Sequence, residues 1–244
     1  MSTRAPKPSS PGDPEIWDFW EDAAAHPPEL NMALDEALLL SAPQRGRVLL
    51  RFYRWDRPAV TIGYVQKYAA APAEGFTIVR RPTGGGVVFH DHDFTYTVVI
   101  PARHWLTDLD RVESYGAINR SVLEGLARCN VEGSLASEHI PKSVDRSRMV
   151  CFSNPTRYDI VMQQRKIAGC AQRRTKTGIL HQGSIHFGGP LPVSRRRLSE
   201  MLCLGFRGEM NADMQPFVPP DSLLSAAQQL VQDRYDTDAW NRRR

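Results

Sequence analysis

The chain has 244 residues, of which 41% are hydrophobic and 24% charged, and this composition excludes a wholly disordered protein. The net charge of +4 favours acidic partners, but the arginine clusters lack the aromatic-interleaved motifs of nucleic-acid binding, so we expect no nucleic-acid partner. No window approaches the roughly 20 apolar residues of a membrane-spanning helix, and the N-terminus lacks the apolar run of a secretory signal. We therefore expect a cytoplasmic protein with four reduced cysteines and no membrane partner.

The first half of the chain predicts a tail, one helix and five short strands. Residues 1–14, rich in Pro and Ser, predict a flexible tail, which leaves a single domain over residues 15–244. A helix is expected from Glu29 to Pro43, because leucines recur there at helical spacing. The strands are predicted at residues 47–55, 59–64, 75–81, 86–90 and 94–101, with the last two forming a hairpin.

The second half predicts further helices and a second set of hairpins. Apolar residues fall on one side of a helix over about residues 109–129. A helix capped by Ser194 is expected to end near Gly205, and another follows Asp221. Strands are predicted at residues 157–162, 166–169 and 178–187, with a turn at 163–165. Helices and antiparallel hairpins in this order favour an α+β fold over a doubly wound parallel one.

Three consecutive glycines lie in the stretch RRPTGGGVVFHDHD. They favour either a tight turn or a loop that a ligand approaches closely, and the polar groups at both ends shift the balance towards a site. No Gly-Lys-Ser/Thr follows, so the stretch is not a phosphate-binding P-loop. The candidate substrate-binding residues here are Arg81, Gly84, Gly85, Gly86, His90 and Asp91.

A metal site is not expected in this stretch. His90, His92 and Asp93 include residue types that bind metals, but the sequence offers no further His or Cys cluster beside them to complete a ligand set. Hydrogen bonds that fix the turn are the simpler interpretation of these three side chains.

Cys151 and Lys166 lie fifteen positions apart on either side of a predicted hairpin. From composition alone, Cys151 is more often a small buried residue and Lys166 a solvated lysine at a strand edge. If the hairpin brings the ammonium near the thiol, the cation lowers the cysteine pKa from about 8.5 and makes a nucleophile. The spacing permits this meeting without proving it.

The segment after Lys166 combines small residues with hydrogen-bonding ones. Small residues allow a ligand to approach, whereas the alternative is a plain hairpin connection with solvated basic side chains. Cys170 fits a small packing residue better than a nucleophile. The candidate substrate-binding residues here are Gly169, Ala171, Gln172, His181, Gly183 and Ser184.

Five ordered blocks resemble the lipoate/octanoate protein ligase and transferase family, which is related to the biotin protein ligases. They are NMALDEAL, RFYRWDRPAVTIGYVQ, RRPTGGGVVFHD, KIAGCAQRR and HQGSI. The resemblance implies an α+β catalytic domain with a mixed, largely antiparallel sheet flanked by helices. It also implies a tunnel for a medium-length acyl chain beside the glycine-rich strand. The turn before Lys166 lacks the glycine common in the family, which puts its geometry in question.

The same resemblance implies roles for two residues. Lys166 matches the family's essential lysine, which contacts the acyl carbonyl, and Cys151 matches the nucleophile of the cysteine-dependent octanoyltransferases. These take octanoate from octanoyl-acyl carrier protein and pass it to a lysine of a lipoyl domain or a glycine cleavage H-type protein, without a cofactor. The stretch from Gly188 to Arg244 is too short for the accessory domain that many ligases carry.

Three alternatives remain open. An ATP-dependent lipoate ligase would use ATP and magnesium to form an acyl adenylate. A lipoyl amidotransferase would also use a cysteine, to move the acyl group between carrier domains. A non-catalytic acyl-chain sensor or lipoyl-domain binding module would use the same pocket, but retention of both Cys151 and Lys166 disfavours it.

Overall fold

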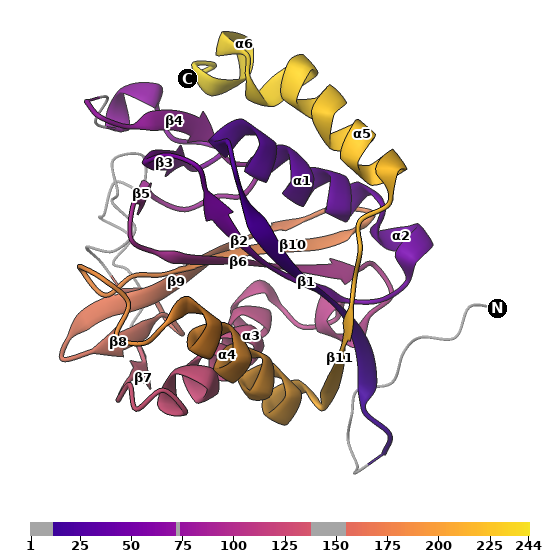
Figure 1. Cartoon of the computed structure of the whole chain (residues 1–244), viewed down its shortest axis with the longest axis vertical. Coiled ribbons are helices and arrows are strands. Elements are labelled where there is room, and N and C mark those ends of the chain that lie inside the picture. Colours follow the sequence, from indigo (N-terminus) through magenta and orange to yellow (C-terminus); the bar gives the residue numbers. More distant parts are fainter. Residues whose placement is uncertain (1–11, 72–73, 138–154) are drawn as a thin grey trace.

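The computed structural model describes residues 12–71, 74–137 and 155–244 (Figure 1). The strands are β1 Glu15–His26, β2 Leu49–Trp55, β3 Ala59–Ile62, β4 Thr77–Arg80, β5 Val88–His90, β6 Phe94–Pro101, β7 Ser134–Leu135, β8 Ile160–Met162, β9 Arg165–Arg174, β10 Gly178–Ile185 and β11 Ala212–Pro216. The α-helices are α1 Pro28–Leu40, α2 Ala42–Arg45, α3 Arg111–Ala127, α4 Arg195–Met210, α5 Asp221–Leu230 and α6 Asp238–Asn241. Single turns of other helix types cover Tyr68–Ala70, Trp105–Thr107 and Val231–Tyr235.

The strands form two sheets. The larger has the order β11-β1-β2-β6-β10-β9-β8-β7, and the smaller has the order β4-β3-β5. Only the pairs β1–β11, β1–β2 and β3–β4 are parallel among the described strands, and the others are antiparallel. The predicted α+β fold with a mixed, largely antiparallel sheet is therefore confirmed.

Helices cover both faces of the large sheet (Figure 1). The helices α3 and α4 pack on one face, and α1 and α5 cover the other. Val98 and Val99, neighbours in β6, belong to the hydrophobic cores on opposite faces, which explains why this strand is apolar almost throughout. Within the described residues, no helix combines the length and hydrophobicity needed to cross a bilayer.

The helix predicted to end near Gly205 continues to Met210. Gly205 does not end it, because its missing side chain is needed for packing. A Cβ at Gly205 would lie 2.2 Å from the Ser121 carbonyl oxygen, and one at Gly125 would lie 2.7 Å from the Leu202 Cα. Glycines on both helices thus let α3 and α4 approach closely, and tertiary packing overrides the usual stop signal.

The hairpin predicted for residues 86–90 and 94–101 is wrong. The strand β6 has neighbours on both sides, β2 and β10, whereas β5 pairs with β3 in the small sheet. Three strands were also missed: β1 within residues that carried no predicted element, the two-residue β7, and β11 after α4. The strands β1 and β11 are held by parallel pairing to segments distant in the chain, which a local pattern does not reveal.

The predicted hairpin around Lys166 is confirmed by the antiparallel pairing of β8 with β9. Its two turn residues, Gln163 and Gln164, have φ values of +48° and +64°. Two left-handed residues in a two-residue loop define a type I′ turn, for which Asn-Gly is the preferred pair. The turn keeps the usual hairpin twist without glycine, at the cost of strain in Gln164.

Gln164→Gly is expected to stabilise the protein by about 0.5–1 kcal/mol, because glycine adopts a positive φ without steric cost. The same change at Gln228, exposed within α5, is the control and should destabilise by about 0.5–1 kcal/mol. Urea unfolding measures both. A loss of stability in Gln164→Gly would contradict the type I′ assignment.

Candidate functional site

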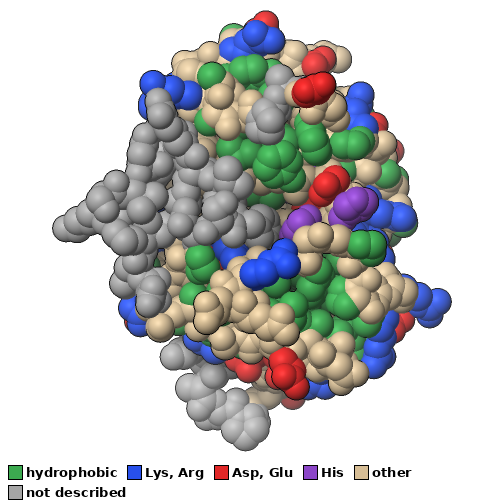
Figure 2. Space-filling view, turned by 90° about the vertical axis from the view of Figure 1, so that its left-hand side faces the viewer, with side chains coloured by type: hydrophobic (Ala, Val, Ile, Leu, Met, Phe, Trp, Pro, Cys, Tyr) green, Lys and Arg blue, Asp and Glu red, His purple; other side chains and the backbone are tan. Residues whose placement is uncertain are grey.

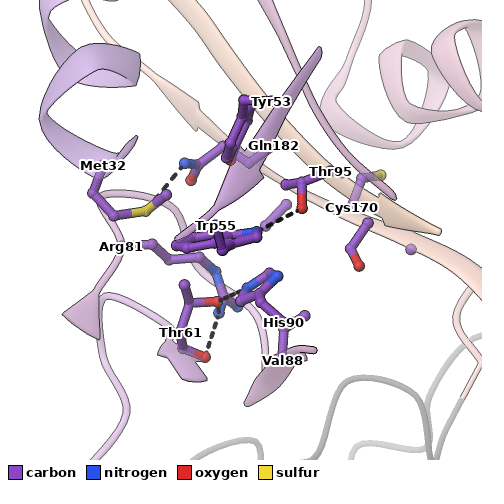
Figure 3. A pocket seen from close by; sticks show the side chains of 14 residues that line it. Met32, Tyr53, Trp55, Thr61, Arg81, Val88, His90, Thr95, Cys170 and Gln182 are labelled. Atoms are coloured by element: carbon purple, nitrogen blue, oxygen red, sulfur yellow. Dashed lines mark hydrogen bonds between the residues drawn. The ribbon is translucent and has the colours of Figure 1, made fainter. Parts of the chain in front are cut away.

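A pocket lies between the large sheet and the small one, where α1 meets them (Figure 3). The face of the molecule on which β3, β5 and β8 lie gathers hydrophobic, basic, acidic and histidine side chains near its centre (Figure 2). The lining residues are Met32, Tyr53, Trp55, Thr61, Arg81, Val88, His90, Thr95, Gly169, Cys170, Ala171, Gln182, Gly183 and Ser184.

Six of the predicted site residues line this pocket: Arg81, His90, Gly169, Ala171, Gly183 and Ser184. Sequence reasoning missed the contribution of α1 and β2, which supply Met32, Tyr53 and Trp55. Aromatic residues in a strand are typical of any core, so only their position beside the glycine-rich segments marks them as pocket residues.

Lys166 reaches the pocket wall through a space that Gly169 leaves open. A Cβ on Gly169 would lie 2.2 Å from the Lys166 Cε and 2.5 Å from its Nζ, so the end of the lysine side chain occupies the space of that methyl group. The buried ammonium forms an ion pair with Asp159 at 2.8 Å. Asp159 also accepts hydrogen bonds from the backbone and hydroxyl of Thr156. Asp159, which the sequence analysis missed, therefore fixes the position of the ammonium group.

Arg81 holds the glycine-rich segment in place. Its guanidinium donates to the carbonyl oxygens of Gly84 and Gly86, and on the other side to the backbone and hydroxyl oxygens of Thr61. Gly85 has a φ of +85°, and its carbonyl oxygen would lie 2.1 Å from a Cβ on Gly63. These glycines thus serve close backbone packing next to the pocket, and Arg81 ties that backbone to β3.

His90 is fixed by a buried carboxylate. Its Nδ1 lies 2.7 Å from Asp93, which also accepts hydrogen bonds from the hydroxyls of Ser184 and Thr95. Burial alone would raise the Asp93 pKa, but attraction to His90 and these hydrogen bonds outweigh it and hold the pKa below 3.8. The His90 ring stacks on Trp55 with centroids 4.1 Å apart. The expectation of hydrogen-bonding side chains is therefore met for His90 and Asp93, whereas His92 is exposed and contributes its backbone amide to a hydrogen bond with Asp91.

A second buried carboxylate, Asp35 of α1, ties the helix to the sheet. It accepts hydrogen bonds from Arg51 at 2.8 Å and from Thr97 and Gln182 at 2.7 Å each. Gln182 in turn accepts a hydrogen bond from Thr83, which precedes the three glycines. One chain of hydrogen bonds therefore links α1, the large sheet and the glycine-rich segment around the pocket.

Gln172 and His181 lie on the other face of the sheet, towards α3. Alternation along β9 and β10 separates them from Ala171 and Gln182, which line the pocket. Gln172 donates to His181 Nδ1 at 3.0 Å and accepts from Ser114 of α3. These two predicted substrate-binding residues thus contact the core beneath α3 and do not line this pocket.

Two further residues that the sequence singled out, Cys170 and Asp91, do not direct a side chain into the pocket. Cys170 lines the pocket through its place in β9, but its sulfur points away from the cavity and accepts a hydrogen bond from Asn119 (Figure 3). Asp91 is exposed, with a carboxylate oxygen 3.7 Å from His186. Cys151 lies outside the described residues, four positions before Pro155, where the description resumes.

His181 predicts a distinct pH dependence of stability. It is fully buried, and burial lowers its pKa to about 3. Between about pH 6 and 4 the unfolded chain binds a proton at His181 that the folded chain does not, so stability falls by up to about 1.4 kcal/mol per pH unit.

His181→Gln should reduce that slope, whatever its effect on stability at neutral pH. Urea unfolding at a series of pH values measures the slope, and the same substitution at exposed His92 is the control. An unchanged slope in His181→Gln would contradict a neutral buried His181.

The comparisons with known proteins agree with this architecture. Residues 27–205 match the family model of the lipoyl protein ligase A/B catalytic domain. The chain is 32% identical to octanoyltransferase LipM of Anoxybacillus flavithermus, over 94% of this chain and 99% of that protein. It is 37% identical to octanoyltransferase LipM of Staphylococcus epidermidis, over 70% of this chain and 66% of that protein.

Solved structures show the same fold at lower identity. A lipoate-protein ligase A bound with ATP has a TM-score of 0.77 at 22% identity, covering 93% of this chain and 98% of that one. The bipartite lipoate protein ligase of Thermoplasma acidophilum has a TM-score of 0.72 at 20% identity, covering 93% and 96%. The chain therefore belongs to the lipoyl protein ligase A/B catalytic domain family.

Proposed function

We propose that this protein transfers an octanoyl group from octanoyl-acyl carrier protein to a lysine of a lipoyl domain or a glycine cleavage H-type protein, through a thioester on Cys151. The chain is an acyltransferase of protein lipoylation, as its octanoyltransferase relatives indicate.

The observation that carries the proposal is the position of Lys166. Its buried ammonium, held by Asp159, lies against Gly169 in the pocket wall. A fixed cation beside a pocket is suited to stabilise an oxyanion that forms on an acyl carbonyl. The walls contributed by Met32, Trp55 and Val88 suit an unbranched acyl chain.

The reaction proceeds in two steps. The Cys151 thiolate attacks the octanoyl thioester, the bond to the carrier sulfur breaks as the new thioester forms, and the departing carrier thiolate takes a proton from water. The neutral amine of the acceptor lysine then attacks this thioester, and the Cys151 thiol is released as the amide forms. In each step Lys166 donates a hydrogen bond to the tetrahedral oxyanion, a contribution of about 3 kcal/mol for one such donor.

Neither step requires ATP or a metal ion. A thioester is already activated towards an amine, so no acyl adenylate has to form, and we propose that the enzyme works without a cofactor. A lipoate ligase starts from a free carboxylate and does need that activation, which makes the ATP requirement a clear discriminator between the two activities.

Intact-protein mass spectrometry tests the covalent step. Wild-type protein mixed with octanoyl-acyl carrier protein, without ATP, should gain the mass of one octanoyl group. The Cys151→Ser variant should gain no octanoyl group that a neutral amine can remove. Addition of apo lipoyl domain should then transfer the octanoyl group from the enzyme to the domain. If no adduct forms, yet the enzyme modifies the domain from free lipoate, ATP and magnesium, the ligase activity replaces the proposal.

Gly169→Ala tests the placement of Lys166. The new methyl group occupies the path of the lysine side chain, so we expect kcat to fall about 100-fold while the fold is retained. Gly189→Ala is the matched control, because its Cβ would meet no atom within 4 Å. Steady-state transfer and thermal unfolding measure the two effects. Full activity in Gly169→Ala would contradict the role of Lys166.

A further inference from the structure

We infer that a basic surface next to the pocket, formed by Tyr64, Val65, Arg173, Arg243 and Arg244, binds the acidic acyl carrier protein that delivers the octanoyl thioester. We call it the arginine platform. The inference rests on the proposed function, because it names the surface that one of its protein substrates uses.

The platform is built around one aromatic ring. The Arg243 guanidinium lies 3.7 Å from the Tyr64 ring centroid, and that of Arg173 lies 5.2 Å from it. Arg243 also donates to the Tyr64 carbonyl oxygen at 2.6 Å. Val65, the next residue, leaves half of its surface exposed. Arginine and tyrosine with an exposed apolar neighbour form the composition that is enriched at protein interfaces.

Arg173 and Arg243 give the platform its positive charge. Within the described part of the chain, neither Arg173 nor Arg243 has a carboxylate within ion-pair distance, and aromatic rings order a guanidinium without cancelling its charge. A hydrogen bond with Arg243, together with the charges of Arg243 and Arg173, lowers the pKa of the Tyr64 hydroxyl. An acidic surface or a phosphate group would supply the missing anion.

The platform is rigid because the C-terminal segment is anchored. Trp240 donates through its indole to the Arg80 carbonyl oxygen, and buried Arg80 donates back to the carbonyl oxygens of Trp240 and Asn241. The Arg244 carbonyl oxygen accepts a hydrogen bond from the Tyr68 backbone. Cations held in this way lose little conformational entropy when a partner binds.

The platform adjoins the pocket through two connections. Arg173 lies two residues after Ala171 on the same face of β9, and it donates to the Pro82 carbonyl oxygen just before the glycines. The Tyr64 amide donates to the Thr83 carbonyl oxygen at 2.8 Å. A partner seated here therefore rests beside the glycine-rich segment.

The distance from the lysine favours the donor over the acceptor. Arg173 lies four positions after Gly169, which contacts Lys166, and this separation is about 14 Å along the strand. An acceptor lysine on its four-carbon stem is too short to reach Lys166 from a domain seated on the platform. A carrier protein holds its acyl group on a long, phosphate-linked arm, which bridges that distance and adds another anion.

The Arg173→Ala, Arg243→Ala double variant tests the platform. The KM for octanoyl-acyl carrier protein should rise about 10-fold and depend less on salt, with kcat nearly unchanged. The KM for octanoyl-N-acetylcysteamine, a small neutral donor, and the KM for the acceptor domain should stay at wild-type values. The control is Arg196→Ala, Arg207→Ala, which removes the same charge from exposed positions of α4.

A second variant distinguishes weaker carrier binding from misfolding of the double variant. Val65→Asp places a carboxylate among the arginines at an exposed position and should also raise the KM for the carrier protein. An equal rise with the small donor, an equal rise in the control, or a rise only in the acceptor KM would overturn the inference. If wild-type protein accepts octanoate from neither donor, the proposed function itself fails. If it accepts both and the double variant matches the control, only the platform fails.

Discussion

The passage of one lysine side chain over one glycine is the contact on which the site depends. Lys166 belongs to β9, and the end of its side chain lies over Gly169, which lines the pocket. Gly169 leaves the space that the side chain occupies, and Asp159 holds the ammonium by an ion pair. A buried cation without such a partner would be strongly destabilising, so the carboxylate and the glycine are both required for the lysine to stay there.

Two further buried carboxylates join segments that are distant in the chain around the same cavity. Asp93 gathers His90, Thr95 and Ser184 from three strands, and Asp35 joins α1 to the large sheet. Their hydrogen bonds determine the shape of the walls, because a buried charge is tolerated only where its acceptor sites are filled. The pocket is therefore lined largely by apolar surface but held in position by polar groups behind it.

Local sequence patterns predicted the elements whose contacts are also local. The helix of residues 28–40, the helix of residues 111–127 and the hairpin at Lys166 were all predicted within a few residues of their observed bounds. The prediction failed where distant pairing decides the structure. Gly205 does not end α4, because α3 packs against it. The strand β5 does not pair with β6, because β2 and β10 occupy both sides of β6.

The sequence by itself determined the family, the α+β class and the two segments rich in small residues that flank the pocket, since these follow from ordered motifs and short-range periodicity. The tertiary structure alone decided which of those residues face the cavity. It placed Gly169 and Ala171 in the pocket wall and turned Gln172 and His181 towards α3. The physical reason is that strand register and the stacking of helices on the sheet depend on contacts between residues far apart in the chain.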